Sequence, residues 1–543
     1  MDSAFVGHVH ALRLALTDPR FDACAVTGAF AVQPGARDVL DKAAALAPEG
    51  PGPYADRLAD AVEAAGTSVQ RPELGTLVAT VPAGPAERDA ATAAVAAVDD
   101  EAVRLRTAVK SRDGFFTTFF ISPYSRYIAR WCARRGLTPN QVTTASLITA
   151  LIAAGCAATG DRWGYVAAGV LLLVSFVLDC TDGQLARYSL QYSTMGAWLD
   201  ATFDRAKEYS FYAGLALGAA SNGDDVWGLA LGAMILMTCR HVVDFSFNEA
   251  NHDATANTSP TAALSDRLDS VGWTVWVRRM IILPIGERWA MIAVLTAFTT
   301  PRIVFYALLI GCAFGALYTT AGRALRSLTR KATRTDRAAQ ALAALADSGP
   351  LAELQARLLR GRAGSFGSVY VAALGTLLMV GAALYLPFGD PRLIAVAVVY
   401  AMAAGLAVAA PLKGALDWLI PPLFRAAEYL TVLVLAAKAD VPGALPAAFG
   451  LIAAVAYHHY DTVYRIRGGT GAPPHWLVRT IGGHEGRVLL LTVLAAVLMS
   501  RAADFPVALT VTAVFVALVV LVESIRFWVS SGAPAVHDEG EPA

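Results

Sequence analysis

Four carboxylates lie close together in a segment that is otherwise mostly apolar. Asp179 and Asp182 are three residues apart, so on a helix they share one face. Asp200 and Asp204 are four residues apart and also share a face. Carboxylates at membrane depth are costly and usually mark a functional site. Because like charges repel, four of them need compensation, and their hard oxygen atoms suit magnesium, manganese or calcium ions. The pattern therefore predicts a divalent-metal site, and no Cys/His cluster offers a zinc alternative.

The residues between the two acid pairs suit a phosphate ligand. Gly183 and Gly196 remove side chains where a phosphate or nucleotide would approach the backbone. Arg187 adds a fixed cation that can bind a phosphate oxygen. An alternative interpretation needs no ligand: the acid pairs are simply neutralised by Arg187, Arg205 and Lys207.

The whole pattern, D-x2-D-G-x2-A-R-x8-G-x3-D-x3-D, resembles the signature of the CDP-alcohol phosphotransferase (CDP-alcohol phosphatidyltransferase) family. All the fixed positions are present: Asp179, Asp182, Gly183, Ala186, Arg187, Gly196, Asp200 and Asp204. The resemblance implies a membrane enzyme with six helices and two divalent cations, Mg²⁺ or Mn²⁺. Such an enzyme displaces CMP from a CDP-linked alcohol with a second alcohol, as in phospholipid or inositol-phosphate headgroup synthesis.

The resemblance also implies roles for individual residues. All four aspartates are expected metal ligands, and Asp204 is in addition the expected base for the acceptor hydroxyl. The expected CDP pocket comprises Asp182, Gly183, Ala186, Arg187 and Gly196. The candidates for binding an anionic acceptor are Arg126, Arg130, Arg205 and Lys207. The segment from Asp113 to Thr143 resembles inositol-phosphate-using members, so inositol phosphate is the expected acceptor.

Two other functions fit parts of the pattern. A membrane transporter could use inward-facing acids to bind a coupling ion. A CDP-alcohol pyrophosphatase would use the same metals with water as the acceptor. Release of CMP separates the transporter from the two enzymes, and dependence on an added alcohol separates the transferase from the pyrophosphatase.

Composition predicts an integral protein of the cell membrane. The chain has 543 residues, of which 56% are hydrophobic and 16% are charged, and its mean hydropathy is +0.49. Lys+Arg and Asp+Glu both number 44, so net charge identifies no partner, and we expect membrane lipids and no nucleic acid. The six cysteines lack ligand spacing and are predicted to be reduced.

We predict a mainly α-helical polytopic fold with two six-helix transmembrane units and a small N-terminal α/β soluble domain. Residues 1–110 form the soluble domain, interpreted as a nucleotidyltransferase remnant or a docking domain. Residues 111–322 form the catalytic unit with an interfacial helix, 323–365 a charged helical linker, and 366–543 a degenerate six-span repeat. The predicted spans are 141–159, 162–187, 195–219, 226–247, 284–300, 303–322, 366–387, 391–412, 416–437, 443–462, 486–500 and 505–528.

Within the soluble domain, the periodicity predicts a strand over 23–32, amphipathic helices over 36–47 and 54–65, an extended segment over 67–81 and a helix over 85–110. Arginines cluster at 126–135, 278–279 and 323–337, whereas Asp224 and Asp225 fall in an opposite loop. The positive-inside rule therefore predicts that the N-terminal domain, the linker and the C-terminus are cytoplasmic.

An internal repeat relates the two membrane units. Residues 198–209, WLDATFDRAKEY, align with 418–429, WLIPPLFRAAEY, and six positions agree. Ile420 and Phe424 replace the second acid pair, so the second unit is predicted to bind no metal. Arg425 is predicted to hold helices together by pairing with Glu428 or with Asp461. The chain as a whole resembles an actinobacterial-type fusion, and we expect an internal pseudo-dimer.

Overall fold

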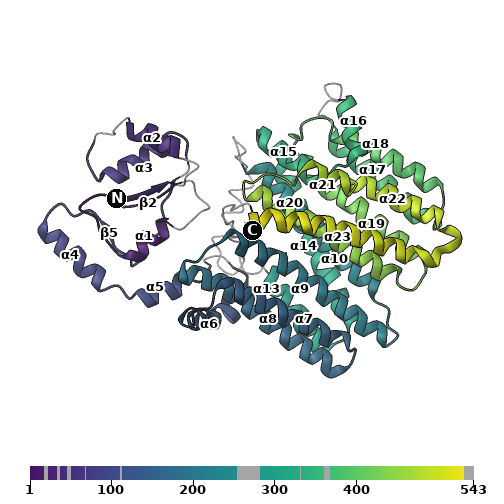
Figure 1. Cartoon of the computed structure of the whole chain (residues 1–543), viewed down its shortest axis with the longest axis horizontal. Coiled ribbons are helices and arrows are strands. Elements are labelled where there is room, and N and C mark those ends of the chain that lie inside the picture. The colour runs from purple at the N-terminus through teal and green to yellow at the C-terminus, as the bar shows by residue number, and fades with distance from the viewer. Residues whose placement is uncertain are drawn as a thin grey trace.

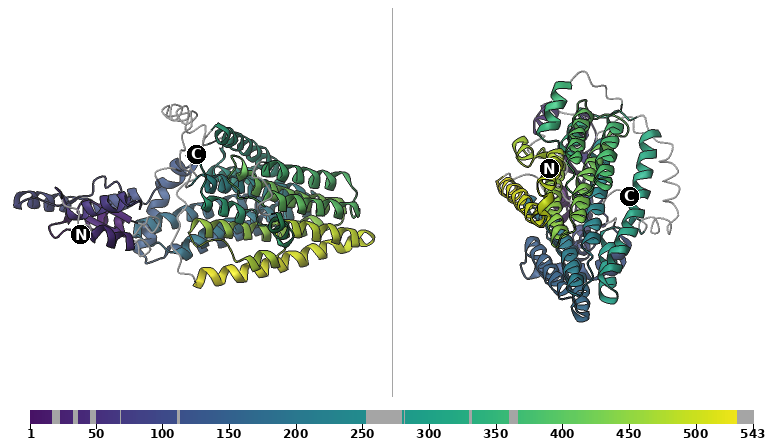
Figure 2. Two further views of the ribbon diagram at one scale, coloured as in Figure 1. Left: turned by 90° about the horizontal axis from the view of Figure 1, so that it is seen from above. Right: turned by 90° about the vertical axis from the view of Figure 1, so that its right-hand side faces the viewer.

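The computed structural model describes residues 1–16, 23–32, 37–45, 50–67, 69–110, 113–252, 280, 282–329, 332–359 and 367–530. The basic pair at 278–279, which contributed to the predicted orientation, lies outside these ranges. A small N-terminal body of strands and helices projects from one end of a large helical body (Figure 1). The long helices of that body run roughly alongside one another, as the view from above shows (Figure 2).

The N-terminal body contains short strands and helices. Strand β2 (Ala23–Val26) pairs antiparallel with β3 (Ala29–Val32) and parallel with β4 (Val69–Gln70), and β1 (Val6–Gly7) pairs antiparallel with β5 (Ala79–Thr80). Five helices accompany them: α1 (Val9–Leu16), α2 (Arg37–Ala45), α3 (Tyr54–Ala64), α4 (Pro85–Ala96) and α5 (Asp100–Thr107). Ala23, Ala25 and Val62 belong to the apolar core under β2.

Two sequence predictions in this body were wrong. The single strand over 23–32 is a hairpin, because the chain turns at Gly28, whose φ of 77° favours glycine. The single helix over 85–110 is two helices. Asp99 leaves helical geometry and its side chain caps α5 by accepting a hydrogen bond from the backbone of Ala102 at 3.0 Å.

The helical body begins with a short π-helical turn, η2 (Thr117–Ile121), and with α6 (Ser122–Arg134). The first set of long helices is α7 (Pro139–Ala158), α8 (Arg162–Ser189), α9 (Thr194–Ser221), α10 (Trp227–Asn251), α13 (Ile285–Phe298) and α14 (Pro301–Thr329). Two linker helices follow, α15 (Asp336–Leu345) and α16 (Pro350–Leu359). The later elements are α17 (Ser368–Tyr385), α18 (Arg392–Ala407), η3 (Asp417–Leu419), α19 (Ile420–Ala439), α20 (Ala444–Arg467), α21 (His475–Thr480), α22 (Gly483–Val497), η4 (Met499–Asp504) and α23 (Phe505–Ser530).

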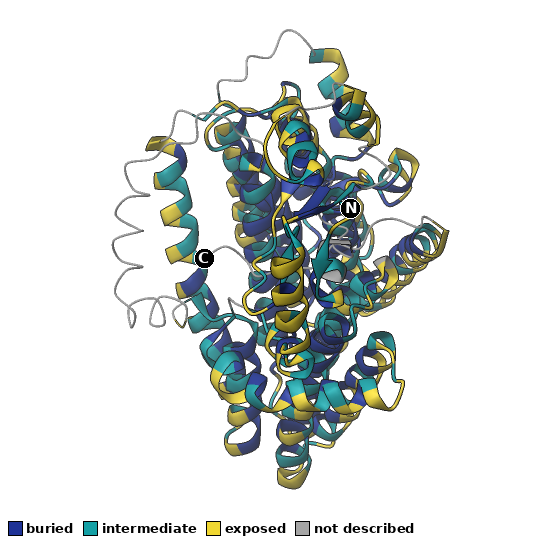
Figure 3. Cartoon of the chain, turned by 90° about the vertical axis from the view of Figure 1, so that its left-hand side faces the viewer, coloured by how far each residue is buried: buried dark blue, intermediate teal, exposed yellow. Residues whose placement is uncertain are grey.

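The protein is an integral membrane protein. Within the described residues, eight helical segments are long and apolar enough to cross a bilayer. The other predicted spans are helical too, but α13 and α18 are short, and α9 and α20 carry several charged residues. Large apolar side chains are exposed on the outer helix faces, which appear as exposed bands in Figure 3. Examples are Ile148, Leu151, Ile310, Phe314, Leu374, Leu377, Val511 and Val514.

Equivalent helices of the two sets make equivalent contacts. Helix α7 packs on α8 and α9, and α17 packs on α18 and α19. Helix α8 packs on α13, as α18 does on α22, and α10 packs on α14, as α20 does on α23. The likeness extends upstream of the first span of each set. Glu287 of α13 accepts a hydrogen bond from the backbone of Phe116, at 3.3 Å, and Glu485 of α22 accepts one from Gly349, at 2.9 Å.

A buried ionic cluster occupies each set. In the first, Glu208 accepts from Arg205 at 2.9 Å and lies 3.4 Å from Arg288. In the second, Glu428 accepts from Arg425 at 2.8 Å and from Arg487 at 2.5 Å. The predicted Arg425–Glu428 pair is therefore present. The alternative pairing with Asp461 is wrong, because Asp461 pairs with Arg465, one helical turn away, at 2.9 Å.

The second cluster includes an aspartate that the sequence did not reveal. Asp347, in the turn between α15 and α16, lies 3.2 Å from Arg425, 2.7 Å from Arg487 and 3.1 Å from His458. Burial alone would raise the pKa of Asp347, but the neighbouring Arg487, His458 and Arg425 outweigh it and hold this pKa well below its usual range. The turn of the linker is thus fixed in the second set of helices by charge.

The two sets of helices are in contact. Helix α10 packs on α19 and α20, and α9 packs on α20 and α23. Several aromatic pairs cross this boundary. Phe247 meets Trp418 at a centroid separation of 5.3 Å, Trp227 meets Phe449 at 5.7 Å, and Trp198 meets Trp528 at 6.3 Å.

Candidate active site

Helices α8 and α9 bring the two acid pairs together. Helix α8 ends at Leu190, which adopts a left-handed conformation with φ of 55° and reverses the chain. Ser193 then caps α9 by accepting a hydrogen bond from the backbone of Gly196, at 2.9 Å. The short connection therefore sets the last turns of α8 beside the first turns of α9, where the carboxylates lie.

Three of the four predicted ligands converge. Asp179 of α8 and Asp200 and Asp204 of α9 each offer an oxygen atom, and these atoms lie within 4.8 Å of one another. Asp179 and Asp204 are partly buried, whereas Asp200 is exposed. The set consists only of carboxylate oxygens drawn from two helices, which is the donor chemistry that Mg²⁺ and Mn²⁺ prefer.

Asp182, the fourth predicted ligand, is buried one helical turn after Asp179. Its Oδ2 atom is buried and has no hydrogen-bond partner among the described residues. A buried carboxylate oxygen without a partner is costly. A cation bound next to the other three carboxylates would remove this cost, so the four residues fit a divalent-metal site.

Comparison with known proteins agrees with the signature. Residues 136–317 match the CDP-alcohol phosphatidyltransferase family. This segment is a CDP-alcohol phosphatidyltransferase domain. Residues 336–543 match a second family, which is described as a family of unknown function, DUF5941.

Individual relatives match part of the chain. The chain is 32% identical over 113 residues to an archaetidylinositol phosphate synthase of Pyrococcus horikoshii, which covers 21% of this chain and 58% of the relative. It is 35% identical over 123 residues to a phosphatidylinositol phosphate synthase of Mycolicibacterium smegmatis, covering 22% and 53%. It is 41% identical over 86 residues to a bifunctional IPC transferase and DIPP synthase of Rubrobacter xylanophilus, covering 16% and 19%. The chain therefore spans slightly more than half the length of the first two relatives and less than half that of the third.

The phosphatidyltransferase domain contains a lysine among its carboxylates. We predicted Lys207 as an acceptor contact, but its side chain is only 1% exposed and its ammonium donates to Asp179 and, at 3.1 Å, to Asp204. The sequence carried the signal for this position, because Lys207 lies three residues after Asp204 and seven after Asp200 on the same helix face. The lysine neutralises part of the cluster in the way that our ligand-free alternative supposed.

The predicted CDP-pocket residues lie along the same turns of α8 and at the start of α9. A side chain at Gly183 would meet the guanidinium of Arg187 at 3.5 Å, whereas at Gly196 it would press against Asn140 at 2.8 Å. Ala186 is buried. Arg187 donates through Nε to the backbone carbonyl of Ala108, at 2.7 Å.

Two of the remaining acceptor candidates already have protein partners. Arg130 lies 3.4 Å from Glu101 of the N-terminal body, and Arg205 pairs with Glu208. Arg126 stacks beside the Tyr127 ring, 5.0 Å from its centroid, and its buried Nε has no hydrogen-bond partner among the described residues. Three of the four candidate cations, Arg130, Arg205 and Lys207, are therefore paired with carboxylates in this structure.

The N-terminal body contacts the phosphatidyltransferase domain through α5, which sequence analysis missed. Glu101 accepts a hydrogen bond from the hydroxyl of Tyr188 at 3.0 Å and lies 3.6 Å from Arg134. Together with the bond from Arg187 to Ala108, these contacts fix α5 against the end of α8 that carries the first acid pair. No local pattern could have predicted contacts between residues so far apart in the chain.

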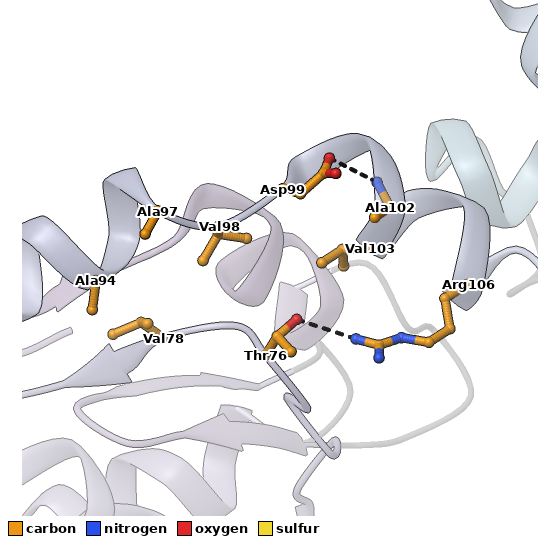
Figure 4. A pocket seen from close by; sticks show the side chains of 9 residues that line it. All are labelled: Thr76, Val78, Ala94, Ala97, Val98, Asp99, Ala102, Val103 and Arg106. Atoms are coloured by element: carbon orange, nitrogen blue, oxygen red, sulfur yellow. Dashed lines mark hydrogen bonds between the residues drawn. The ribbon is translucent and has the colours of Figure 1, made fainter.

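A pocket of about 590 Å³ lies in the N-terminal body, beside α4 and α5 (Figure 4). Its lining is mostly apolar, with Thr76, Asp99 and Arg106 as the polar members, and Arg106 donates to Thr76 at 3.1 Å. None of the predicted site residues lines it. The pocket is therefore separate from the carboxylates.

Proposed function

We propose that this chain is a metal-dependent CDP-alcohol phosphotransferase that moves a phospho-alcohol group from a CDP-alcohol to an acceptor alcohol and releases CMP. The convergence of Asp179, Asp200 and Asp204 from two helices, in a domain of this family, carries the proposal. The buried Oδ2 of Asp182, for which the described residues offer no hydrogen-bond partner, supports a second ligand-binding position beside them.

In the proposed reaction, an acceptor hydroxyl oxygen attacks the phosphorus atom that bears the donor alcohol. The bond from this phosphorus to the bridging oxygen breaks, and CMP departs with that oxygen. The acceptor proton passes to a carboxylate oxygen of Asp204, which would be the general base. Divalent cations, Mg²⁺ or Mn²⁺, held by the four aspartates would neutralise charge on the diphosphate and on departing CMP.

The donor would lie along the end of α8. Gly183 leaves space next to Arg187, whose guanidinium donates through Nε to Ala108 and is the proposed contact for a phosphate oxygen. Asp182, Ala186 and Gly196 would complete the CDP pocket. Inositol phosphate is the proposed acceptor, supported by the names of the two inositol phosphate synthases among the relatives. Arg126 is the candidate for the acceptor anion with the best support, because its buried Nε has no hydrogen-bond partner within the part of the chain that the structure describes.

The proposed architecture has two six-helix units, α7 to α14 and α17 to α23, packed as an internal pseudo-dimer with catalysis in the first. The equivalent helix contacts and the matched ionic clusters of the two sets support it. Residues 1–110 form a docking domain, and the linker helices α15 and α16 belong with the second unit, since the second family match begins at residue 336. The arginines of α6 favour a cytoplasmic location for this end of the bundle in the cell membrane.

The test is acceptor-dependent release of CMP by the purified, lipid-reconstituted full chain. With CDP-diacylglycerol and inositol phosphate, the chain should release CMP and form an equal amount of a new phospholipid. This phospholipid should be heavier than the phosphatidic acid that carries the same acyl chains. CMP release that is equal with and without the acceptor, accompanied by phosphatidic acid, would identify a pyrophosphatase. No CMP from any CDP-alcohol, with the protein folded and metal bound, would contradict both enzymatic assignments and favour a transporter.

A further inference from the structure

The acidic helix α9 has two faces with different neighbours. Asp200, Asp204 and Lys207 follow one another at helical spacing and face the carboxylate cluster. Trp198 and Arg205 are seven residues apart, which is about two turns, and lie roughly 140–160° around the helix from Asp200. Each of them also contacts an aromatic ring of the second set of helices. Helix α9 therefore lies between the cluster and the second unit.

At its first turn, α9 rests on Trp528 of α23. The indole rings of Trp198 and Trp528 are nearly parallel, with an interplanar angle of 21°, and both side chains are buried. Trp528 is itself fixed, because its Nε1 donates to Asp461 at 2.7 Å. Asp461 is in turn held by Ser524 at 2.8 Å and by Arg465. The start of α9, where Asp200 lies, thus rests on a rigid group in the second unit.

Two turns later, α9 rests on Tyr460 of α20. The guanidinium of Arg205, the residue after Asp204, lies over the Tyr460 ring, 5.2 Å from its centroid. The Tyr460 hydroxyl is 2.5 Å from Nδ1 of His241, and this nitrogen lies 3.4 Å from Arg205. Tyr460 therefore contacts both Arg205 and the α10 histidine that Arg205 approaches.

We propose that the second unit positions the metal-binding helix of the first, through Trp528 and Tyr460. The inference rests on the proposed function, to which it adds a role for the non-catalytic half of the chain. Tyr460 and Trp528 are positioning residues, because they contact the face of α9 opposite to the carboxylates and reach neither metal nor substrate. A unit that contributes no carboxylates would then be required for the metal site of its neighbour.

Manganese affinity measured by calorimetry on the full chain tests this without relying on turnover. Tyr460→Leu and Trp528→Leu should each weaken Mn²⁺ binding at least tenfold and lower kcat in the CMP-release assay. Phe449→Leu is the matched control, because it removes an aromatic contact between the units, with Trp227, away from the acidic residues. It should change Mn²⁺ affinity less than twofold at a similar loss of thermal stability. Equal effects of the three variants on Mn²⁺ affinity would overturn the proposal.

A milder pair of variants keeps the test valid if the leucine variants do not fold. Tyr460→Phe removes only the hydroxyl that contacts His241, and should weaken Mn²⁺ binding about threefold. Tyr400→Phe removes a buried hydroxyl that pairs with His484, inside the second unit, and should leave binding unchanged. Equal Mn²⁺ affinities for this pair would also overturn the proposal. If the wild-type chain binds Mn²⁺ but releases no CMP, the proposed function fails. The Mn²⁺ affinities of the variants then still test the positioning role.

Discussion

Replacing Lys207 with methionine should strengthen divalent-metal binding. The ammonium of Lys207 donates to two of the predicted ligands, Asp179 and Asp204, and its side chain is 1% exposed. It therefore competes with cations for the same carboxylate oxygens. Methionine has a similar length and keeps the packing without the charge.

The structure gives the scale of the effect. At the 3.1 Å that separates Nζ from the Asp204 oxygen, two unit charges attract by about 5 kcal/mol at an effective dielectric constant of about 20. Only part of this energy would appear as metal affinity, because the surrounding groups relax. We expect a gain of at least about 1.4 kcal/mol, a tenfold lower dissociation constant for Mn²⁺. Without metal, the unpaired acids should destabilise Lys207→Met by about 3–5 kcal/mol, since breaking a buried pair has that typical cost.

Calorimetric titration with Mn²⁺, together with thermal unfolding in EDTA and in excess Mg²⁺, measures both effects. Lys438→Met is the control, because Lys438 donates to the backbone carbonyls of Leu384 and Leu386 and not to carboxylates. The control should leave Mn²⁺ affinity unchanged. A Lys207→Met variant that binds Mn²⁺ no more tightly than wild type, with unchanged stability in EDTA, would refute the reasoning.

Three further outcomes are expected. Asp204→Asn should bind CDP-diacylglycerol within about threefold of wild type in equilibrium dialysis, yet lose turnover by 10²-fold or more, because a base acts only in the chemical step; normal turnover would exclude Asp204 as the base. Asp347→Asn should lower stability by about 3–5 kcal/mol at neutral pH, because it leaves buried Arg425 and Arg487 without this anion. Because the folded-state pKa of Asp347 is depressed, the stability that its carboxylate contributes is complete above the unfolded pKa of about 4 and is lost only as the pH falls further. Unfolding scans in which the stabilities of wild type and variant already converge between pH 5 and 7 would contradict this assignment. The double variant Asp179→Asn/Asp200→Asn should abolish specific Mn²⁺ binding to the whole chain, and a remaining site of wild-type affinity would show that these two aspartates do not hold the metal.

The spacing of the acids predicted part of the carboxylate cluster that the structure shows. Residues three or four apart on a helix share a face, so the proximity of Asp200 to Asp204 follows from local geometry, whereas the approach of Asp179 depends on the packing of α8 beside α9. The same spacing rule places Lys207 on the helix face of Asp204, whereas its positive charge alone had suggested an acceptor contact. Local rules also explain the start of the span predicted from residue 416: it begins as the 3-10 turn η3 at Asp417 and becomes α-helical at Ile420, where Pro421 and Pro422 suit the first turn.

Contacts between distant segments were beyond sequence reasoning. Asp347 lies in a polar linker, and nothing near it in sequence indicates that Arg425 and Arg487 surround it. Glu101 likewise reads as an ordinary helix-surface acid, although it binds Tyr188 next to the signature arginine. Such partners depend on how whole helices dock, which a periodicity pattern in one segment does not encode.

The most direct test of the central claim is CMP release by the purified chain with Mg²⁺, compared with the Asp182→Asn variant. Asp440→Asn is the matched control, since Asp440 is exposed, lies in the second unit and has a left-handed φ of 49° that asparagine tolerates. The account predicts release by wild type and Asp440→Asn, at least 10²-fold slower release by Asp182→Asn, and none in excess EDTA. Full CMP release in EDTA, or by Asp182→Asn, would contradict it.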